Sequence, residues 1–368
     1  MSSFDKTATG TESRHSVTVP KTFAESALEL LTRIGALDPT MQIKSDGEAI
    51  TIAMARQLSD AEVARLSRLV PGANFAERFF QKRVKAPRTL EEALANRIPR
   101  RLLSDIPKSL DIVGDIAVFE TIPSLSNYEK IIAEGIMEVQ PSVRAVFAKA
   151  GTVSGEDRVR PLRHLTGENR TETIHREFGC RFKLDLSKVF FSPRLSTEHK
   201  RVADQVERGE SVIDMFAGIG PFSILIAKKL SSVEVDAVDS NNHATKFIRE
   251  NARLNRVSER VRVHNGDVRD VIEKELRQRA NRVIMNHPSK SNEFLEAACN
   301  ALQEPGGILH YYRFVDGGDW KEKIMSEFNN ALNASGYRAE RILEAHVVRE
   351  VGPMNWQIVL DARVVKAS

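Results

Sequence analysis

Residues 211–224 constrain the fold of this chain more than any other stretch. An apolar run ends at Asp214, a glycine-rich turn contains Gly218 and Gly220, and a helical apolar pattern begins at Ile224. A strand, a tight glycine turn and a helix in this order are typical of the place where an open α/β sheet binds a nucleotide-like ligand. A pair of glycines is a weak signal by itself, so the residues at the ends of the neighbouring strands decide the interpretation.

The turn differs from a dinucleotide-binding loop in two ways. Such a loop has three glycines, as G-x-G-x-x-G, whereas Ser223 stands in the third place and Pro221 comes directly after Gly220. Proline lacks the backbone N–H that a pyrophosphate would need as a donor. A ligand with an amino acid and a nucleoside but no phosphate fits better, so we predict S-adenosylmethionine as the cofactor.

Acidic residues end three of the predicted strands. Asp239 ends the second strand, where a carboxylate can accept hydrogen bonds from both ribose hydroxyls. Asp267 ends the third strand, at the place for an adenine amino group, and Asp214 precedes the loop, near a methionine ammonium. Each aspartate alone would more often be structural, but three at successive strand ends favour a cofactor site. To that site we also assign Phe216, Gly218 and Gly220.

A second polar turn, Asn286-His287-Pro288, comes after the predicted strand 282–285. The amide of Asn286 carries both a donor and an acceptor, so it can read a nucleobase edge beside the cofactor methyl group. A turn-forming Asn-x-Pro with no chemical role is the structural alternative. We predict catalytic roles for Asn286 and Pro288, and a cofactor contact for Asn286.

Predicted strands and helices alternate from residue 196 onward. Alternation at this pitch indicates a parallel, doubly wound sheet, and two long strands are expected after it, at 337–344 and 356–362. The expected fold class is α/β, with a Rossmann-like domain preceded by two smaller α/β or α+β domains. The predicted segments are a disordered tail (1–15), a small N-terminal domain (16–86), a middle domain (87–190) and a catalytic domain (191–368).

The two smaller domains are predicted from shorter patterns. In the first, helices are expected at 24–34 and 60–69, the second capped by Ser59, with a hairpin turned at Asp46-Gly47. In the second, one strand is expected over 110–120. The boundary near Ala86 lies in a basic segment that prolines interrupt.

Composition excludes several classes of protein. The 368 residues include no apolar run near 20 residues, so no membrane span is predicted, and the polar N-terminus does not resemble a secretory signal. Cys180 and Cys299 lack metal-ligand spacing, which favours a reduced, cytoplasmic compartment and no metal. The net charge of +4 is small, but residues 158–183 hold seven basic against three acidic side chains. That segment suits phosphate contacts, although charge alone fits a salt-bridged surface better.

Several blocks of sequence together resemble the archaeal and eukaryotic tRNA (guanine-37, N1)-methyltransferase family. The resemblance runs from about residue 16 to the C-terminus. It implies a class I methyltransferase domain, a middle domain that helps to hold the anticodon stem-loop, and a small domain on the tRNA outer corner. No obligate protein partner is evident from the sequence, so we expect a monomer. The blocks are Val212–Ile224 with Asp239, Asp267 and Asn286, together with Phe191–Leu195, Glu168–His175 and Leu110–Ile116.

The resemblance also implies roles for individual residues. The family's general base, a glutamate shortly after Ser-Pro-Arg, matches Glu198, and its arginine that stabilises charge on guanine O6 matches Arg158. Arg194 belongs to the Ser-Pro-Arg element and is assigned to the cofactor pocket. Two positions depart from the pattern: His199 stands where many members have arginine, and His287 replaces an apolar residue in the Asn-x-Pro turn.

Three other functions remain open at this point. A wyosine-pathway enzyme would act on the same nucleotide, by methylating a tricyclic intermediate or by transferring an aminocarboxypropyl group; Pro221 favours methyl transfer. A non-catalytic RNA-binding protein is disfavoured because Glu198, Arg158 and Asp239 are all present. A small-molecule methyltransferase is disfavoured by the two additional domains.

Overall fold

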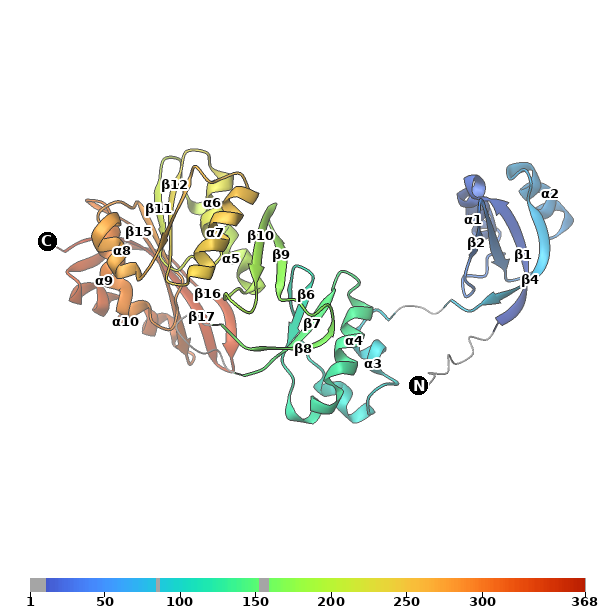
Figure 1. The fold of residues 1–368 in the computed structure, drawn as a ribbon, viewed down its shortest axis with the longest axis horizontal. Helices are drawn as coiled ribbons and strands as arrows, with labels where there is room; N and C mark the ends of the chain where they lie inside the picture. The colour runs from blue at the N-terminus through green and yellow to red at the C-terminus, as the bar shows by residue number, and fades with distance from the viewer. Residues whose placement is uncertain (1–10, 84–86, 152–158, 368) are drawn as a thin grey trace. The chain divides into compact units, whose positions relative to one another are not determined.

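A computed structural model of the chain describes residues 11–83, 87–151 and 159–367. The chain divides into two compact units, Met1–Ala86 and Pro87–Ser368, each with its own hydrophobic core (Figure 1). No helix in these described ranges is long and apolar enough to cross a bilayer.

The first unit is a four-stranded antiparallel sheet with two helices, in the strand order β2-β3-β1-β4. Helix α2 begins where the sequence predicts, because Ser59 and Glu62 form a reciprocal capping box. The predicted hairpin at Asp46-Gly47 is also present, between β2 and β3. The elements are β1 (Thr11–Pro20), a 3-10 turn (Lys21–Phe23), α1 (Ala24–Arg33), β2 (Lys44–Asp46), β3 (Ala49–Met54), α2 (Asp60–Leu69) and β4 (Asn74–Gln81).

Strand β1 corrects the prediction of a disordered tail over residues 1–15. Residues 11–15 lie in β1, where Thr11 pairs with Gln81 and His15 with Glu77 on β4. The side chains of this half of the strand are polar, and each is exposed or only half-buried, so backbone hydrogen bonds rather than apolar burial hold it. For that reason no hydrophobic alternation marks it in the sequence. The rest of the predicted tail lies outside the described residues.

The second unit begins with a four-stranded sheet, in the order β5-β6-β7-β8. The single strand expected over 110–120 is wrong: the chain turns at Gly114, which has φ +59°, and forms a hairpin. The elements are α3 (Leu90–Leu94), 3-10 helices (Arg100–Asp105 and Pro123–Tyr128), β5 (Asp111–Val113), β6 (Ile116–Phe119), α4 (Glu129–Val139), β7 (Ala145–Lys149) and β8 (Leu162–Gly167).

A hairpin of β9 (Glu172–Glu177) and β10 (Cys180–Asp185) connects this sheet to the larger one. Phe182 and Leu184 are buried in the core of the larger sheet, and Asn251 exchanges hydrogen bonds with the backbone of Lys183. By its packing the hairpin therefore belongs with the larger sheet. This differs from the predicted boundary between residues 190 and 191, which rested on local sequence pattern and could not detect the contact with Asn251.

The larger sheet has seven strands in the order β13-β12-β11-β14-β15-β17-β16. Strands β11 to β15 are parallel, and β17 and β16 add an antiparallel edge. Successive residues of β11 enter different cores: Val212 packs with α6 and α7, and Ile213 packs with α9 and α10. Helices thus cover both faces (Figure 1), which confirms the predicted doubly wound α/β fold.

The strands of the larger sheet and the helices that cover it have the following bounds. The strands are β11 (Ser211–Asp214), β12 (Glu234–Asp239), β13 (Val261–Asn265), β14 (Arg282–Met285), β15 (Gly306–Asp316), β16 (Tyr337–Gly352) and β17 (Asn355–Lys366). The helices are a 3-10 turn (Pro193–Leu195), α5 (Ser196–Gln205), α6 (Pro221–Lys229), α7 (Asn242–Leu254), α8 (Val268–Val271), a π-helical turn (Ile272–Leu276), α9 (Ser291–Ala301) and α10 (Trp320–Ala334).

Candidate active site

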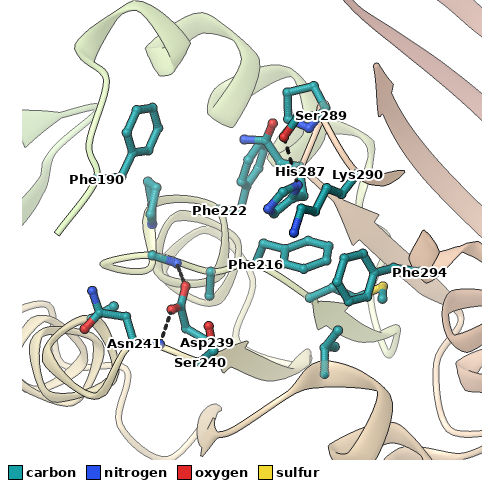
Figure 2. Close-up of a pocket in the computed structure, with 18 of the residues that line it drawn as sticks. Phe190, Phe216, Phe222, Asp239, Ser240, Asn241, His287, Ser289, Lys290 and Phe294 are labelled. Atoms are coloured by element: carbon teal, nitrogen blue, oxygen red, sulfur yellow. Dashed lines mark hydrogen bonds between the residues drawn. The ribbon is translucent and has the colours of Figure 1, made fainter. Parts of the chain in front are cut away.

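A cavity of about 490 Å³ lies at the carboxyl ends of the parallel strands β11, β12, β13 and β14 (Figure 2). This is the edge at which open α/β sheets bind ligands. Its wall includes six of the residues predicted from sequence: Phe216, Gly218, Asp239, Asp267, Asn286 and Pro288. The structure therefore brings together side chains that are up to 72 positions apart, between Phe216 and Pro288.

The glycine turn is held in a conformation that other residues adopt with difficulty. Gly218 has φ +57° and Gly220 has φ +87°, and Gly220 precedes the first residue of α6, Pro221. A Cβ on Gly220 would also lie 3.0 Å from Cδ1 of Ile224. Gly220 thus shapes the loop from behind and does not itself line the cavity, whereas Gly218 does.

Asp239 connects the glycine turn to the second strand. Its Oδ2 accepts a hydrogen bond from the backbone N–H of Gly218 at 2.7 Å, and its Oδ1 accepts one from Asn241 N–H at 2.9 Å (Figure 2). A carboxylate offers about four lone-pair sites, so it can accept several hydrogen bonds at once. Asp239 can therefore hold the loop and a pair of hydroxyls at the same time.

Asp214 lies beneath the loop and is not part of the cavity wall. Its Oδ2 accepts a hydrogen bond from Ser223 Oγ at 2.7 Å, and the side chain is fully buried. Burial raises the pKa of Asp214 to about 7, and the nearby charge of Asp239 acts in the same direction. The predicted contact with a methionine ammonium therefore has no support in this position; the side chain supports the turn from below.

Aromatic rings form another part of the wall. Phe216 packs against His287 and Phe294 with ring centroids 4.9 and 5.0 Å apart (Figure 2), and Arg269 lies over the Phe294 ring at 5.0 Å. The same Arg269 donates to Asp267, with its Nε 3.0 Å from Oδ1. His287, one of the two departures from the family pattern, is thus part of this aromatic cluster.

Asn286 is the inner end of a chain of hydrogen bonds. Gln357 Nε2 donates to Asn286 Oδ1 at 3.1 Å, Arg349 Nε donates to Gln357 Oε1 at 2.8 Å, and Arg349 Nη1 donates to Ser192 Oγ at 3.0 Å. All four residues line the cavity. Sequence reasoning missed Arg349 and Gln357, which belong to the antiparallel edge strands and carry no local motif.

Glu198 is buried and lies outside the cavity wall. Arg201 donates to both of its oxygens at 2.8 and 2.9 Å, Tyr312 Oη donates to Oε1 at 2.5 Å, and His346 Nε2 lies 3.4 Å from Oε2. Burial would raise the pKa of Glu198, but the hydrogen bonds from His346 and Arg201 outweigh it and lower the pKa to about 2. The neighbouring His199 does line the cavity.

His199 is almost completely buried and has a carboxylate partner. Its Nδ1 lies 2.9 Å from Glu177 Oε2, on strand β9, and its ring meets Phe222 edge-on at 4.7 Å. Glu177 also lies 3.3 Å from His175 Nε2. A histidine at this position is therefore accommodated by an acid from the β9–β10 hairpin, which the sequence pattern could not indicate.

Arg194 lies in a second cavity of about 460 Å³, between the β5-β6-β7-β8 sheet and the seven-stranded sheet. Its Nε donates to Asp111 Oδ1 at 2.6 Å, so the structure does not place Arg194 in the cofactor cavity as predicted. Lys149 and Arg160 also line this cavity, and each pairs with an acid of the same wall, Lys149 with Asp111 and Arg160 with Glu120. The two cavities share four wall residues: Phe190, Phe191, Ser192 and Arg349.

Two further predictions concern Arg158 and the absence of a metal site. Arg158 lies outside the described residues. Among the residues that the structure describes, no group of three or more His, Cys, Asp or Glu side chains could hold a metal ion.

The strand order and the position of the main cavity are those of a class I methyltransferase. The model of the TRM5/TYW2 methyltransferase domain matches residues 173–340, and the model of the TYW2 N-terminal domain matches residues 90–171. The chain is 39% identical over 348 residues to the tRNA (guanine(37)-N(1))-methyltransferase Trm5b of Pyrococcus abyssi, covering 95% of this chain and 98% of that protein. The chain belongs to the TRM5/TYW2 methyltransferase family.

Solved structures agree with this assignment. The crystal structure of Trm5b from Pyrococcus abyssi has a TM-score of 0.68 and 38% identity, covering 96% of this chain and 99% of that one. The complex of aTrm5 with tRNALeu has a TM-score of 0.69 and 28% identity, covering 95% and 99%. A second branch is also similar: the tRNA(Phe) (4-demethylwyosine(37)-C(7)) aminocarboxypropyltransferase of Pyrococcus horikoshii is 33% identical over 76% of this chain and 97% of that protein.

Proposed function

We propose that the protein transfers the methyl group of S-adenosylmethionine to N1 of guanosine at position 37 of tRNA. The observation that carries this proposal is the nearly full-length similarity to Trm5b, which includes the first unit as well as the catalytic part. The aminocarboxypropyltransferase relative leaves about a quarter of this chain without a counterpart. Pro221, directly after the glycine turn, is the residue that the family resemblance associates with methyl transfer.

The main cavity fits S-adenosylmethionine in size and in chemistry. Its volume of about 490 Å³ lies within the range of sites for ligands of this size. The carboxylate of Asp239 suits two ribose hydroxyls, and the rings of Phe216 and Phe294 suit the apolar faces of an adenosine. Pro221 removes one loop N–H, which a ligand without phosphate does not require. When bound, this sulfonium cofactor supplies an activated methyl group and a neutral leaving group.

In this proposal Glu198 takes the proton that guanine N1 carries. N1 becomes a good nucleophile only as this proton leaves, and a carboxylate can accept it by general base catalysis. With a pKa of about 2, Glu198 is ionised at neutral pH and can accept a proton. Such a low pKa also makes it a weak base, so the Arg201 and His346 bonds must loosen when the substrate enters.

Positive charge has a separate role in the same step. Negative charge develops on O6 of guanine as N1 loses its proton, and a guanidinium near O6 stabilises that charge. The family resemblance assigns this role to Arg158. Asn286 and Pro288, in the cavity wall, would hold the base against the methyl donor.

The proposed partner is tRNA, held at the anticodon stem-loop and at the outer corner. The target base must leave its stack to enter an enclosed site, at a cost of a few kcal/mol. Basic side chains of the second cavity, Lys149, Arg160 and Arg194, can offset this cost through phosphate contacts. We also propose that the protein is cytoplasmic and acts as a monomer.

The test is incubation with labelled S-adenosylmethionine and unmodified tRNA transcripts that carry guanosine or adenosine at position 37. Nucleoside mass analysis is expected to show 1-methylguanosine in the guanosine transcript and no product in the adenosine transcript. A transcript carrying the tricyclic wyosine intermediate tests the alternative branch. Labelling of that transcript alone would reject the proposal, and the absence of any labelled nucleoside would favour a non-catalytic RNA-binding protein.

A further inference from the structure

The hydrogen-bond chain that ends at Asn286 has a defined direction. A guanidinium can only donate hydrogen bonds, whereas each side-chain amide has one end that donates and one that accepts. Arg349 Nε lies 2.8 Å from Gln357, so the atom of Gln357 that faces Arg349 must be the carbonyl oxygen. The other end of the Gln357 amide, the NH₂ group, therefore faces Asn286.

The same reasoning continues by one residue. The Gln357 NH₂ group lies 3.1 Å from Asn286, so the atom of Asn286 that faces it must be the acceptor, Oδ1. The NH₂ group of Asn286 is then the end of the amide that does not face Gln357. In the part of the chain that the structure describes, this nitrogen has no protein acceptor, and Asn286 lines the main cavity. The hydrogen-bond network therefore sets the orientation of both amides.

The Arg349 end of this hydrogen-bond chain is held in place by burial and by a further hydrogen bond. Gln357 is 1% exposed, and the Arg349 guanidinium is held at its other end by Ser192 Oγ at 3.0 Å. Reversing the Asn286 amide would bring two NH₂ groups face to face and leave a buried donor without an acceptor, which costs about 1–3 kcal/mol. Asn286 therefore presents a donor to the cavity in a large majority of molecules.

We propose that Arg349 and Gln357 are positioning residues that fix Asn286 as a hydrogen-bond donor, and thereby select a target base with a carbonyl oxygen at that place. This inference rests on the proposed function and specifies it further. Guanine has one carbonyl, O6, whereas adenine carries an amino group at the same ring position. An amino group would meet the Asn286 NH₂ group donor against donor, so the network rejects adenine as well as accepting guanine.

Two substitutions of Gln357 separate this role from ordinary packing. Gln357→Glu keeps the bond to Arg349 and adds a charge pair, so the fold is retained, but a carboxylate has no N–H for Asn286. The Asn286 amide then turns its NH₂ group toward residue 357 and presents its oxygen to the base. Gln357→Met removes both bonds and leaves the Asn286 amide without a preferred direction.

The expected order of kcat/KM for a guanosine-37 transcript is wild type, then Gln357→Met, then Gln357→Glu. We expect a loss of roughly 10-fold or less for methionine and roughly 100-fold for glutamate, the range of one well-placed base contact. The dissociation constant for S-adenosylmethionine should change less than about 3-fold in either variant. Arg363→Met serves as the control and should match wild type. This change removes a partly exposed arginine that lies on β17, like Gln357, and pairs with Glu340 of β16.

Base analogues at position 37 add a readout that a structural role would not change. Sulfur accepts weaker hydrogen bonds than oxygen, so the wild-type preference for guanosine over 6-thioguanosine should fall toward 1 in Gln357→Glu. The preference for guanosine over inosine, which lacks only the 2-amino group, should stay constant. Equal losses in the two variants, an unchanged 6-thioguanosine ratio, or a loss explained by cofactor affinity would each overturn the inference. If wild type forms no 1-methylguanosine, the proposed function itself fails.

Discussion

Tyr312 Oη lies 2.5 Å from Glu198 Oε1 and joins strand β15 to helix α5 across 114 positions of sequence. With Arg201 and His346, it surrounds the carboxylate on which the proposed proton transfer depends. This environment keeps Glu198 ionised. It also keeps Glu198 away from the cavity wall, so entry of the target base has to change these contacts.

Replacing Glu198 with glutamine should reduce turnover without weakening cofactor binding. The amide can still accept from Tyr312 but cannot take a proton from N1, so kcat should fall by roughly 10²–10⁴-fold, the usual share of general base catalysis. Single-turnover assays at saturating tRNA measure this, with calorimetry for the cofactor. Glu340→Gln, on the exposed face of β16, is the control. A normal rate in Glu198→Gln would mean that another group accepts the proton.

His346 should make stability depend on pH. Its hydrogen bond to Glu198 raises its pKa above the ordinary 6.5, against the smaller effect of burial. The protonated form is thus favoured in the folded state, so this stabilisation is complete below pH 6.5 and is lost as pH rises through the raised pKa. Removing the interaction between His346 and Glu198 by the change His346→Gln should lower the free energy of unfolding at about pH 6. The expected decrease is only roughly 0.5–1 kcal/mol, because His346 is partly exposed.

Urea unfolding of His346→Gln and wild type at about pH 6 and about pH 9 measures this effect. The difference between the two proteins should be larger at the lower pH than at the higher. His264, whose pKa is also raised by a carboxylate, is present in both proteins and cancels in the comparison. The same difference at both pH values would show that His346 contributes by packing alone.

Asp239→Ala should weaken S-adenosylmethionine binding by roughly 10–100-fold. The change removes the proposed acceptor for the ribose hydroxyls and also releases the Gly218 N–H that Asp239 holds. Hydrogen bonds to a charged group contribute about 1.5–3 kcal/mol. Calorimetry measures the dissociation constant. Asp270→Ala, an exposed acid on the nearby helix α8, should bind like wild type. An unaltered constant in Asp239→Ala would exclude the ribose contact.

Gly220→Ala should destabilise the fold more than Gly209→Ala. Gly220 has φ +87° and Gly209 has φ +83°, so both substitutions carry a backbone cost of about 1–2 kcal/mol. Only at Gly220 does the new methyl group also meet a neighbour, Cδ1 of Ile224 at 3.0 Å, whereas nothing lies within 4 Å at Gly209. Chemical denaturation gives both free energies. Equal losses of unfolding free energy in the two variants would show that the loop shifts to accommodate the new methyl group, so that the contact with Ile224 adds no cost.

Removing residues 1–86 should leave the remainder folded and reduce affinity for full-length tRNA. The first unit has its own core, which includes Val17, Leu31 and Ile52, so the deletion exposes no core of the second unit. Thermal unfolding tests the first statement and filter binding tests the second. An isolated anticodon stem-loop should bind both forms equally. An insoluble truncated protein would indicate that the first unit is structurally required.

Features set by neighbours in sequence were predictable, and features set by distant pairing were not. The capping box of Ser59 and the glycine turn at Gly218 depend on residues within a few positions, and both agree with the sequence pattern. Asp239 and Asn286 are far apart in sequence, but their common location was also predictable, because parallel strands place their carboxyl ends at one edge. The position of Asp214 under the turn could not be predicted, because it depends on packing with Ser223 and not on its place at a strand end.

Three other features depend on contacts across long stretches of chain. The β9–β10 hairpin packs on α7 through a bond between Lys183 and Asn251, 68 positions apart. Gln357 reaches Asn286 from an antiparallel strand that joins the sheet last in sequence. The resemblance assigned Glu198 as the general base, but two of the partners that surround it, Tyr312 and His346, lie in the last third of the chain and could not be predicted.

The wall that the two cavities share has a thermodynamic consequence. Phe190, Phe191, Ser192 and Arg349 face both spaces, so a ligand that orders them from one side lowers the entropic cost of binding on the other. Linkage then requires reciprocity: if the methyl donor tightens tRNA binding by some factor, tRNA tightens binding of the donor by the same factor. Occupancy of the two cavities would rise together, which disfavours complexes that hold only one of the two reactants.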